Sequence, residues 1–151
     1  MENQDFEVLV IDDDQPTYDL LVRIGNELFP QAHFVWQASY DQTVRYLDDQ
    51  STIPPHIVLL DIDLRQAVDG LDLLPQLRTR FKGKTPVVML SVSDSNDKIN
   101  RAYERGAIAF TRKPDDLQGW RNYMTLLKAY WYETTLLPRS TPPPTHLLNY
   151  L

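Results

Sequence analysis

The chain has 151 residues, 42% hydrophobic and 24% charged, a balance typical of a single globular domain with a core of ordinary size. It has no cysteine, which excludes disulfides, thiolate metal sites and cysteine nucleophiles and fits a cytoplasmic location. With 15 basic and 21 acidic residues the net charge is −6, which disfavours direct binding to nucleic acid because that binding depends on a basic face. No apolar run reaches the ~18 residues that a membrane span needs, and the first residues lack the pattern of a signal peptide.

Short runs rich in apolar and β-branched residues predict five strands, and helical spacing predicts a helix after each of them. In chain order the predicted strands are 6–11, 33–38, 57–61, 87–91 and 107–111, and the predicted helices are 16–29, 40–49, 71–81, about 95–105 and about 116–133. On the fourth helix, Ile99, Ala102 and Tyr103 are expected to face inward. This alternation predicts an α/β fold: a five-stranded parallel sheet, doubly wound as (βα)5 in a flavodoxin-like three-layer α/β/α sandwich.

The predicted last helix carries more apolar surface than one face needs. One stripe is expected to pack on the sheet, and a second lies beside it; in order they are Leu117, Trp120, Met124, Leu127 and Trp131, then Tyr123, Leu126 and Tyr130. So wide an apolar surface requires a cover. We expect residues 1–133 to form the domain and residues 134–151, a proline-containing extension, to pack on it or on a partner. Leu147, Leu148, Tyr150 and Leu151 would supply the cover from the extension; a homodimer through the last helix is the other, compatible, arrangement.

The carboxyl ends of parallel strands meet at one edge of the sheet, and polar residues follow four of the predicted strands there. They are Asp12, Asp13, Asp61, Ser91 and Lys113. Two carboxylates ~4 Å apart repel by about 4 kcal/mol at an effective dielectric of ~20, so such a cluster must protonate or hold a cation. Oxygen ligands without histidine or cysteine favour Mg²⁺, and a lysine and a hydroxyl can contact phosphoryl oxygens. The pattern predicts phosphoryl transfer to an aspartate, with Asp61 at its centre.

Four segments resemble the receiver domains of two-component response regulators. They are VLVIDDD (8–14), HIVLLDIDL with DGLDLL (56–74), TPVVMLSVSD (85–94) and GAIAFTRKP (106–114), and both their order and their spacing match. The resemblance covers about residues 6–133. It implies a protein that accepts a phosphoryl group from a sensor histidine kinase in a reaction that needs Mg²⁺ or Mn²⁺. It also implies no enzymatic activity beyond the protein's own phosphorylation and dephosphorylation.

The resemblance assigns the phosphorylation chemistry to four acidic residues. Asp61 would be the phosphoacceptor. Asp12, Asp13 and Asp61 would bind the metal ion together with the backbone carbonyl of Asp63.

The resemblance also assigns the switch that would follow phosphorylation. Ser91 would be the switch hydroxyl, Lys113 the lysine that contacts the phosphoryl group, and Phe110 the aromatic residue that fills the space Ser91 vacates. The face formed by the fourth helix, the fifth strand and the last helix would then repack and be read by partners. The resemblance implies a cis peptide bond between Lys113 and Pro114.

Two features depart from the family pattern. The loop after Asp61 lacks the usual proline after Leu64 and is one residue longer before Gly70. Val92 stands where a smaller residue is usual, so we expect slow phosphoryl exchange. Asp63, Val92 and Ser93 occupy the positions that tune the lifetime of the phosphoryl group. The ending AYWYETTLLP (129–138) resembles small stand-alone receivers that work with bacterial phytochromes, which implies a phytochrome-type kinase as partner.

Two other interpretations stay open. LLDIDL also fits a haloacid-dehalogenase-type phosphatase, although that family places its DxD motif on the first strand and an acidic metal motif late, where this chain has none. A receiver fold that does not accept phosphate and acts as a docking module is the second alternative. His33, His56 and His146 have no partner at metal-ligand spacing and are interpreted as structural or exposed.

Overall fold

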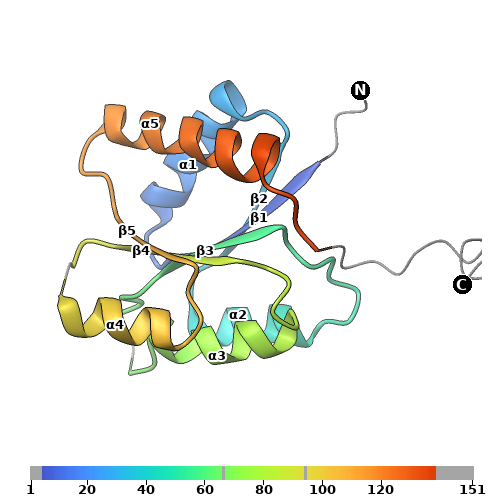
Figure 1. Cartoon of the computed structure of the whole chain (residues 1–151), viewed down its shortest axis with the longest axis vertical. Helices are drawn as coiled ribbons and strands as arrows, with labels where there is room; N and C mark the ends of the chain where they lie inside the picture. The colour runs from blue at the N-terminus through green and yellow to red at the C-terminus, as the bar shows by residue number, and fades with distance from the viewer. Residues whose placement is uncertain (1–4, 66, 94, 139–151) are drawn as a thin grey trace, which may run out of the picture.

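The computed structural model describes residues 5–65, 67–93 and 95–138. One sheet of parallel strands has the order β2-β1-β3-β4-β5, formed by β1 (Phe6–Ile11), β2 (Ala32–Gln37), β3 (Ile57–Asp61), β4 (Val87–Ser91) and β5 (Ala109–Arg112). The helices are α1 (Gln15–Leu28), α2 (Tyr40–Asp48), α3 (Gly70–Arg80), α4 (Asn96–Glu104) and α5 (Leu117–Leu127), with a π-helix, η1 (Lys128–Thr134), after α5. Helices α1 and α5 cover one face of the sheet and α2, α3 and α4 the other (Figure 1). The predicted three-layer α/β/α sandwich is confirmed.

The central strands β1 and β3 are buried on both faces. Alternate residues of β1 point to opposite sides, so Val8 packs in the cluster with α1 and α5, whereas Leu9 packs in the cluster with α2, α3 and α4. The same alternation holds for Ile57 and Val58 at the start of β3. Because both faces are covered, the strands are apolar from Val8 to Ile11 and from Ile57 to Leu60, and the acids that follow, Asp12 and Asp61, are themselves still buried at the edge of the sheet.

Helix α1 begins directly beside the carboxyl end of β1. The Asp14 side chain caps it by accepting a hydrogen bond from the Thr17 N–H (3.2 Å), and Pro16 occupies its first turn, where no N–H is needed. This cap fixes the direction in which the chain leaves Asp12 and Asp13, so these two acids stay at the edge of the sheet. Asp116 caps α5 in the same way through the Gly119 N–H (2.7 Å).

The last helix is α-helical only to Leu127 and continues as the π-helix η1, a difference from the single α-helix that the spacing predicts. The Thr135 N–H donates to the Tyr130 carbonyl (2.9 Å), which is the wider five-residue turn. This turn brings the Tyr132 ring to 5.8 Å from the Phe6 ring and 5.4 Å from the Phe29 ring, measured between centroids. Packing of this aromatic group stabilises the wider turn.

Two residues expected to face the core do not. Leu117 is 58% exposed because it is the first residue of α5 and precedes the buried stripe, which holds Trp120, Met124 and Leu127. Tyr103 is 49% exposed, and its hydroxyl accepts a hydrogen bond from the Phe110 N–H (3.1 Å). Strand β5 is an edge strand, so this phenol pairs with an amide that no neighbouring strand reaches.

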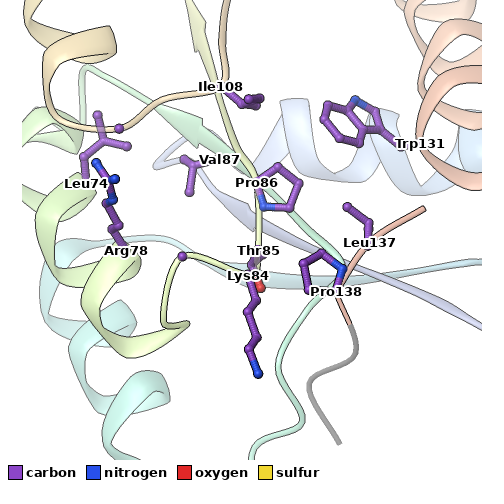
Figure 2. Close-up of a pocket in the computed structure, with 12 residues that line it drawn as sticks. Leu74, Arg78, Lys84, Thr85, Pro86, Val87, Ile108, Trp131, Leu137 and Pro138 are labelled. Carbon is purple, nitrogen blue, oxygen red and sulfur yellow. The ribbon is translucent and has the colours of Figure 1, made fainter. Parts of the chain in front are cut away.

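The first residues of the predicted extension lie against the domain. Leu137 packs beside the cluster that holds α1 and α5, and with Trp131 and Pro138 it lines a cavity of about 330 Å³ (Figure 2). The cavity also borders the start of β4, at the edge of the sheet opposite the carboxyl ends of the strands. Leu147, Leu148, Tyr150 and Leu151, predicted to supply a cover, lie outside the described residues, as does His146. Within the described part of the chain, no helix has both the length and the apolar character that a membrane crossing requires.

Of the other two histidines, one has a structural role and one is exposed. The His56 Nδ1 accepts a hydrogen bond from the Glu7 N–H (2.9 Å), and its ring stacks on Phe6. His33 is exposed and lies near Asp5 and Glu7. Both positions agree with the interpretation of these histidines as structural or exposed.

Gly70 brings the start of α3 against the end of β3. Its N–H donates to the Ile62 carbonyl (2.8 Å), and a Cβ at this position would lie 2.2 Å from the Asp61 carbonyl oxygen. We expect Gly70→Ala to lower the free energy of unfolding by about 3 kcal/mol, because backbone would have to move to admit the methyl group. Urea unfolding would measure the change.

Gly83→Ala is the matched control for that prediction. Gly83 has a φ of +68° but no atom within 4 Å of an added Cβ, so alanine there should cost only about 1 kcal/mol of backbone strain. Equal losses in the two variants would mean that the contact with Asp61 is easily relieved and does not constrain the fold.

Candidate functional site

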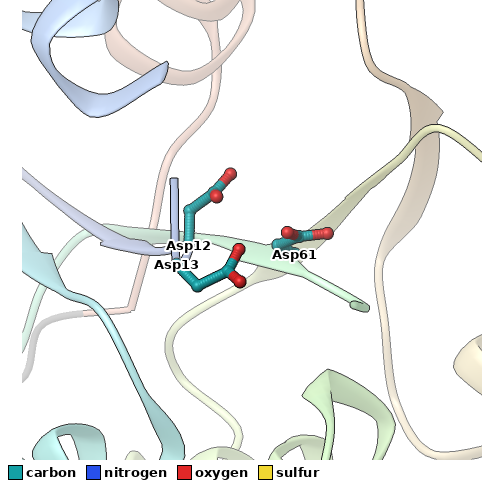
Figure 3. A group of neighbouring side chains, drawn as sticks. All are labelled: Asp12, Asp13 and Asp61. Carbon is teal, nitrogen blue, oxygen red and sulfur yellow. The ribbon is translucent and has the colours of Figure 1, made fainter. Parts of the chain in front are cut away.

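Three carboxylates meet where β1 and β3 end. Asp12 and Asp13 follow β1, Asp61 ends β3, and each offers an oxygen within 4.8 Å of those offered by the other two (Figure 3). Asp12 and Asp61 are buried, and Asp13 is half-buried. The sequence prediction that these acids share one edge of the sheet is confirmed, and their side chains form a compact group of negative charge.

Lys113 supplies the positive charge that makes this group compatible with burial. It follows β5, and its Nζ lies 2.8 Å from Asp12 Oδ2 and 3.2 Å from Asp61 Oδ2. The Lys113 side chain is only 12% exposed. Burial alone would lower the pKa of its ammonium group, but the hydrogen bonds and charges of Asp12 and Asp61 outweigh burial and raise this pKa. The lysine therefore stays charged and bridges the two buried acids.

The environment of Asp61 raises its pKa, so this carboxyl group is harder to ionise than an ordinary aspartate. Burial raises the pKa of Asp61 to about 6; the Lys113 charge opposes this shift and the Asp12 charge adds to it. The Asp63 N–H also donates to Asp61 Oδ1 (3.1 Å), which stabilises the carboxylate and fixes its orientation. At neutral pH Asp61 is thus an ionised carboxylate with incomplete charge compensation, which suits an oxygen nucleophile.

Two hydrogen bonds hold Asp12 in place, one to its side chain and one to its backbone carbonyl. The Asp14 N–H donates to Asp12 Oδ1 (2.9 Å), which leaves Oδ2 toward Lys113. The Trp36 indole N–H donates to the Asp12 carbonyl oxygen (2.7 Å), and the Trp36 ring stacks on Tyr18. Trp36 was not among the residues singled out from the sequence, since an indole on a neighbouring strand gives no local signal of such a contact.

Ser91 and Phe110 occupy the neighbouring strands β4 and β5. Ser91 is buried at the end of β4, and its hydroxyl oxygen accepts a hydrogen bond from the Ser93 N–H (3.0 Å). The Lys113 N–H donates to the Ser91 carbonyl (2.9 Å), so the backbones of these two residues are joined directly. Phe110 is half-buried against the core cluster under α4, while Val92 is exposed.

Arg65 is a functional candidate that motif comparison did not identify. Its Nε lies 3.2 Å from Asp13 Oδ2, and its backbone has a φ of 53°, a left-handed value that is uncommon outside glycine. Its N–H donates to Asp63 Oδ1 (3.0 Å). The only signal in the sequence was the departure of this loop from the family pattern, because Arg65 stands where the usual proline is missing.

The donor set fits a hard divalent cation. Three carboxylates with no imidazole or thiolate among them match the preference of Mg²⁺ and Mn²⁺ for oxygen ligands. One expectation about the site was wrong: the described residues contain no cis peptide bond, so Lys113–Pro114 is trans, the isomer that X–Pro bonds prefer when nothing imposes the other.

Comparison with known proteins agrees with this geometry. A family model for the response regulator receiver domain matches residues 8–123. The probable methanogenesis regulatory protein FilR2 of Methanothrix harundinacea is 27% identical over 130 residues, 83% of each chain. Response regulator Rcp1 of Synechocystis is 25% identical over 119 residues, 78% of this chain and 74% of Rcp1. The structures of Mn²⁺-bound Rcp1 (TM-score 0.78) and of the phosphorylated cyanobacterial phytochrome response regulator RcpA (TM-score 0.81) are each 20% identical and cover 89% of this chain and 99% of theirs.

The raised pKa of Asp61 predicts how stability depends on pH. Because the folded value of about 6 lies above the ordinary value of 3.8, the folded protein binds this proton more tightly than the unfolded chain. Protonation therefore favours folding below about pH 4, and this contribution is lost as the pH rises through about 6. In EDTA, the wild type should lose about 2 kcal/mol of its free energy of unfolding between about pH 4 and about pH 8 relative to Asp61→Asn, which lacks this titrating group.

Urea unfolding of both proteins across this pH range measures the effect. A stability difference between them that does not change with pH would contradict the raised pKa.

Proposed function

The chain belongs to the family of response regulator receiver domains, which act in two-component signal transduction, and we propose that it accepts a phosphoryl group on Asp61 from a sensor histidine kinase. One observation carries this assignment. The Asp61 carboxylate lies at the carboxyl end of the central strand β3, buried, within 4.8 Å of two further carboxylates and 3.2 Å from a buried lysine.

The chemistry asks little of the protein beyond position and charge. An Asp61 oxygen attacks the phosphorus of a phosphohistidine, a P–O bond forms, the P–N bond breaks, and the histidine nitrogen leaves with the electron pair. Lys113 stabilises negative charge on the phosphoryl oxygens. Asp12, Asp13, Asp61 and the Asp63 carbonyl would hold the divalent ion, for which Mg²⁺ is the first choice and Mn²⁺ the alternative. When bound, that ion adds positive charge beside the phosphoryl oxygens.

Phosphorylation would then act through β4 and β5. It replaces the single negative charge of the Asp61 carboxylate by a phosphoryl group that carries about −1.5 to −2 charges, and the phosphoryl oxygens attract the Ser91 hydroxyl away from the Ser93 N–H. Phe110 would move into the space that Ser91 leaves. Tyr103 would follow, because its hydroxyl holds the Phe110 N–H and thereby joins α4 to β5. The face of α4, β5 and α5 is thus the proposed output surface.

The lifetime of the phosphoryl group would depend on the residues around this entrance. We assign this role to Asp63, Val92 and Ser93, with exposed Val92 slowing exchange by narrowing the approach to Asp61. The chain's own phosphorylation and dephosphorylation would be its whole catalytic activity.

The proposed partners are inferred from the exposed residues of the last helix and from the similarity to solved response regulators. The comparison with a cyanobacterial phytochrome response regulator supports a phytochrome-type kinase. Leu126 and Tyr130 are exposed on the last helix and its π-helical end, which supports a homodimer through this helix with residues 134–151 helping to cover it. The net charge of −6 supports a protein that does not bind nucleic acid, and the lack of cysteine fits the cytoplasm.

Intact mass after incubation with acetyl phosphate tests the proposal. The wild type should gain one phosphoryl group in Mg²⁺, the gain should disappear in EDTA, and Asp61→Asn should gain nothing. Asp48→Asn, which changes an exposed carboxylate in α2, is the matched control and should behave as wild type. A folded wild type that gains no mass would instead favour a docking module that works without phosphate.

Phe110→Ala tests the switch separately from the chemistry. The variant should gain the phosphoryl group as wild type does, but its dimer fraction should no longer change on phosphorylation, as measured by light scattering. Phe81→Ala is the control, because Phe81 is also half-buried against the same core cluster but lies after α3, away from β5. Loss of phosphorylation in Phe110→Ala, with Phe81→Ala unaffected, would assign Phe110 to the reaction and not to the switch.

A further inference from the structure

We infer that Arg65 is a tethered cation that competes with the divalent metal ion for Asp13 and so sets the metal affinity of the phosphorylation site. This inference rests on the proposed metal-binding role of Asp13. It does not require that Asp61 be phosphorylated.

Each of the three carboxylates at the site forms an ion pair with one of two cations. Lys113 pairs with both Asp12 and Asp61, and Arg65 pairs with Asp13. Three carboxylates and two cations leave a formal charge of −1. A bound divalent ion would reverse this sign, so like-charge repulsion would favour the departure of one resident cation as the metal enters.

The two cations differ in how easily they can leave. Lys113 is 12% exposed and has two carboxylate partners, at 2.8 and 3.2 Å, so its release would strip a buried ammonium of its partners. Arg65 is 73% exposed, and within the described part of the chain its ion pair is with Asp13, at 3.2 Å between Nε and Oδ2. When this contact breaks, water can hydrate the exposed guanidinium group. Arg65 is therefore the cation that yields to a metal ion.

The loop after Asp61 delivers Arg65 to this place. The Asp63 N–H is bound to Asp61 Oδ1, and Asp63 Oδ1 in turn accepts the Arg65 N–H. The left-handed backbone at Arg65 (φ 53°) turns the chain at this point. A proline could not adopt this φ and would have no N–H to donate, so this loop conformation is incompatible with the proline that the family pattern has after Leu64.

The expected effect on metal affinity is modest because the ion pair is largely in water. Pairs of this exposure change a binding equilibrium by a factor of about two to five. Arg65→Gln should bind Mg²⁺ about two- to five-fold more tightly than wild type at low ionic strength, and the gain should shrink as salt screens the charge. Arg65→Lys keeps the charge and should stay close to wild type.

Titration of the unphosphorylated protein with Mg²⁺, without any phosphodonor, measures this affinity by calorimetry. Tryptophan fluorescence provides a second readout, because one of the three tryptophans, Trp36, donates its indole N–H to the Asp12 carbonyl (2.7 Å). Arg80→Gln is the matched control: it removes the same charge from an exposed ion pair with Asp48, at the end of α3 remote from the site, and should leave Mg²⁺ affinity unchanged.

The outcomes separate this inference from the proposed function. Unchanged or weaker Mg²⁺ binding by Arg65→Gln, with measurable wild-type binding, would overturn the role of Arg65 alone. An equal gain in Arg80→Gln would reduce it to a general effect of net charge and would also overturn it. A wild type that binds no Mg²⁺ would overturn this inference and the proposed metal site together.

Discussion

The ammonium group of Lys113 between Asp12 and Asp61 is the interaction on which the site depends. Both acids are buried at the edge of the sheet, where two like charges without compensation would repel strongly. Lys113 lies 101 residues after Asp12 in the chain, and only the arrival of β5 at the same edge brings it there. The last strand of the fold thus supplies the charge that the first and third strands require.

Lys113 compensates the negative charge of the site only in part. Burial and Asp12 keep the pKa of Asp61 above its ordinary value in spite of the lysine. A carboxylate in this condition gains from any further positive charge, whether from a metal ion or from a proton. A fully neutralised cluster would be more stable but would attract a cation only weakly. The residual negative charge thus lowers the stability of the fold and at the same time favours the binding of a metal ion that the proposed chemistry needs.

The surface beyond β5 is linked to the site through short, direct contacts. The Lys113 N–H binds the Ser91 carbonyl, and two residues before the end of β5 the Phe110 N–H binds the Tyr103 hydroxyl of α4. Few bonds therefore separate the end of β4 from α4. On the opposite face, the aromatic contacts of Tyr132 with Phe6 and Phe29 anchor the π-helical end of the last helix to β1 and to the end of α1.

Local sequence pattern was sufficient for the order of the elements and for the group of acids. Strands covered on both faces are largely apolar, so a polar residue at the end of such a run, as at Asp12, Asp61 and Ser91, marks the edge of the sheet, and parallel pairing brings those ends together. The ion pair of Arg65 with Asp13, the Tyr103–Phe110 hydrogen bond and the π-helical turn could not be predicted in this way. They depend on contacts between different elements of the fold or on a left-handed backbone that no local preference favours. Tertiary packing therefore decided how the charges at the site are distributed, whereas the sequence by itself determined which charges gather there.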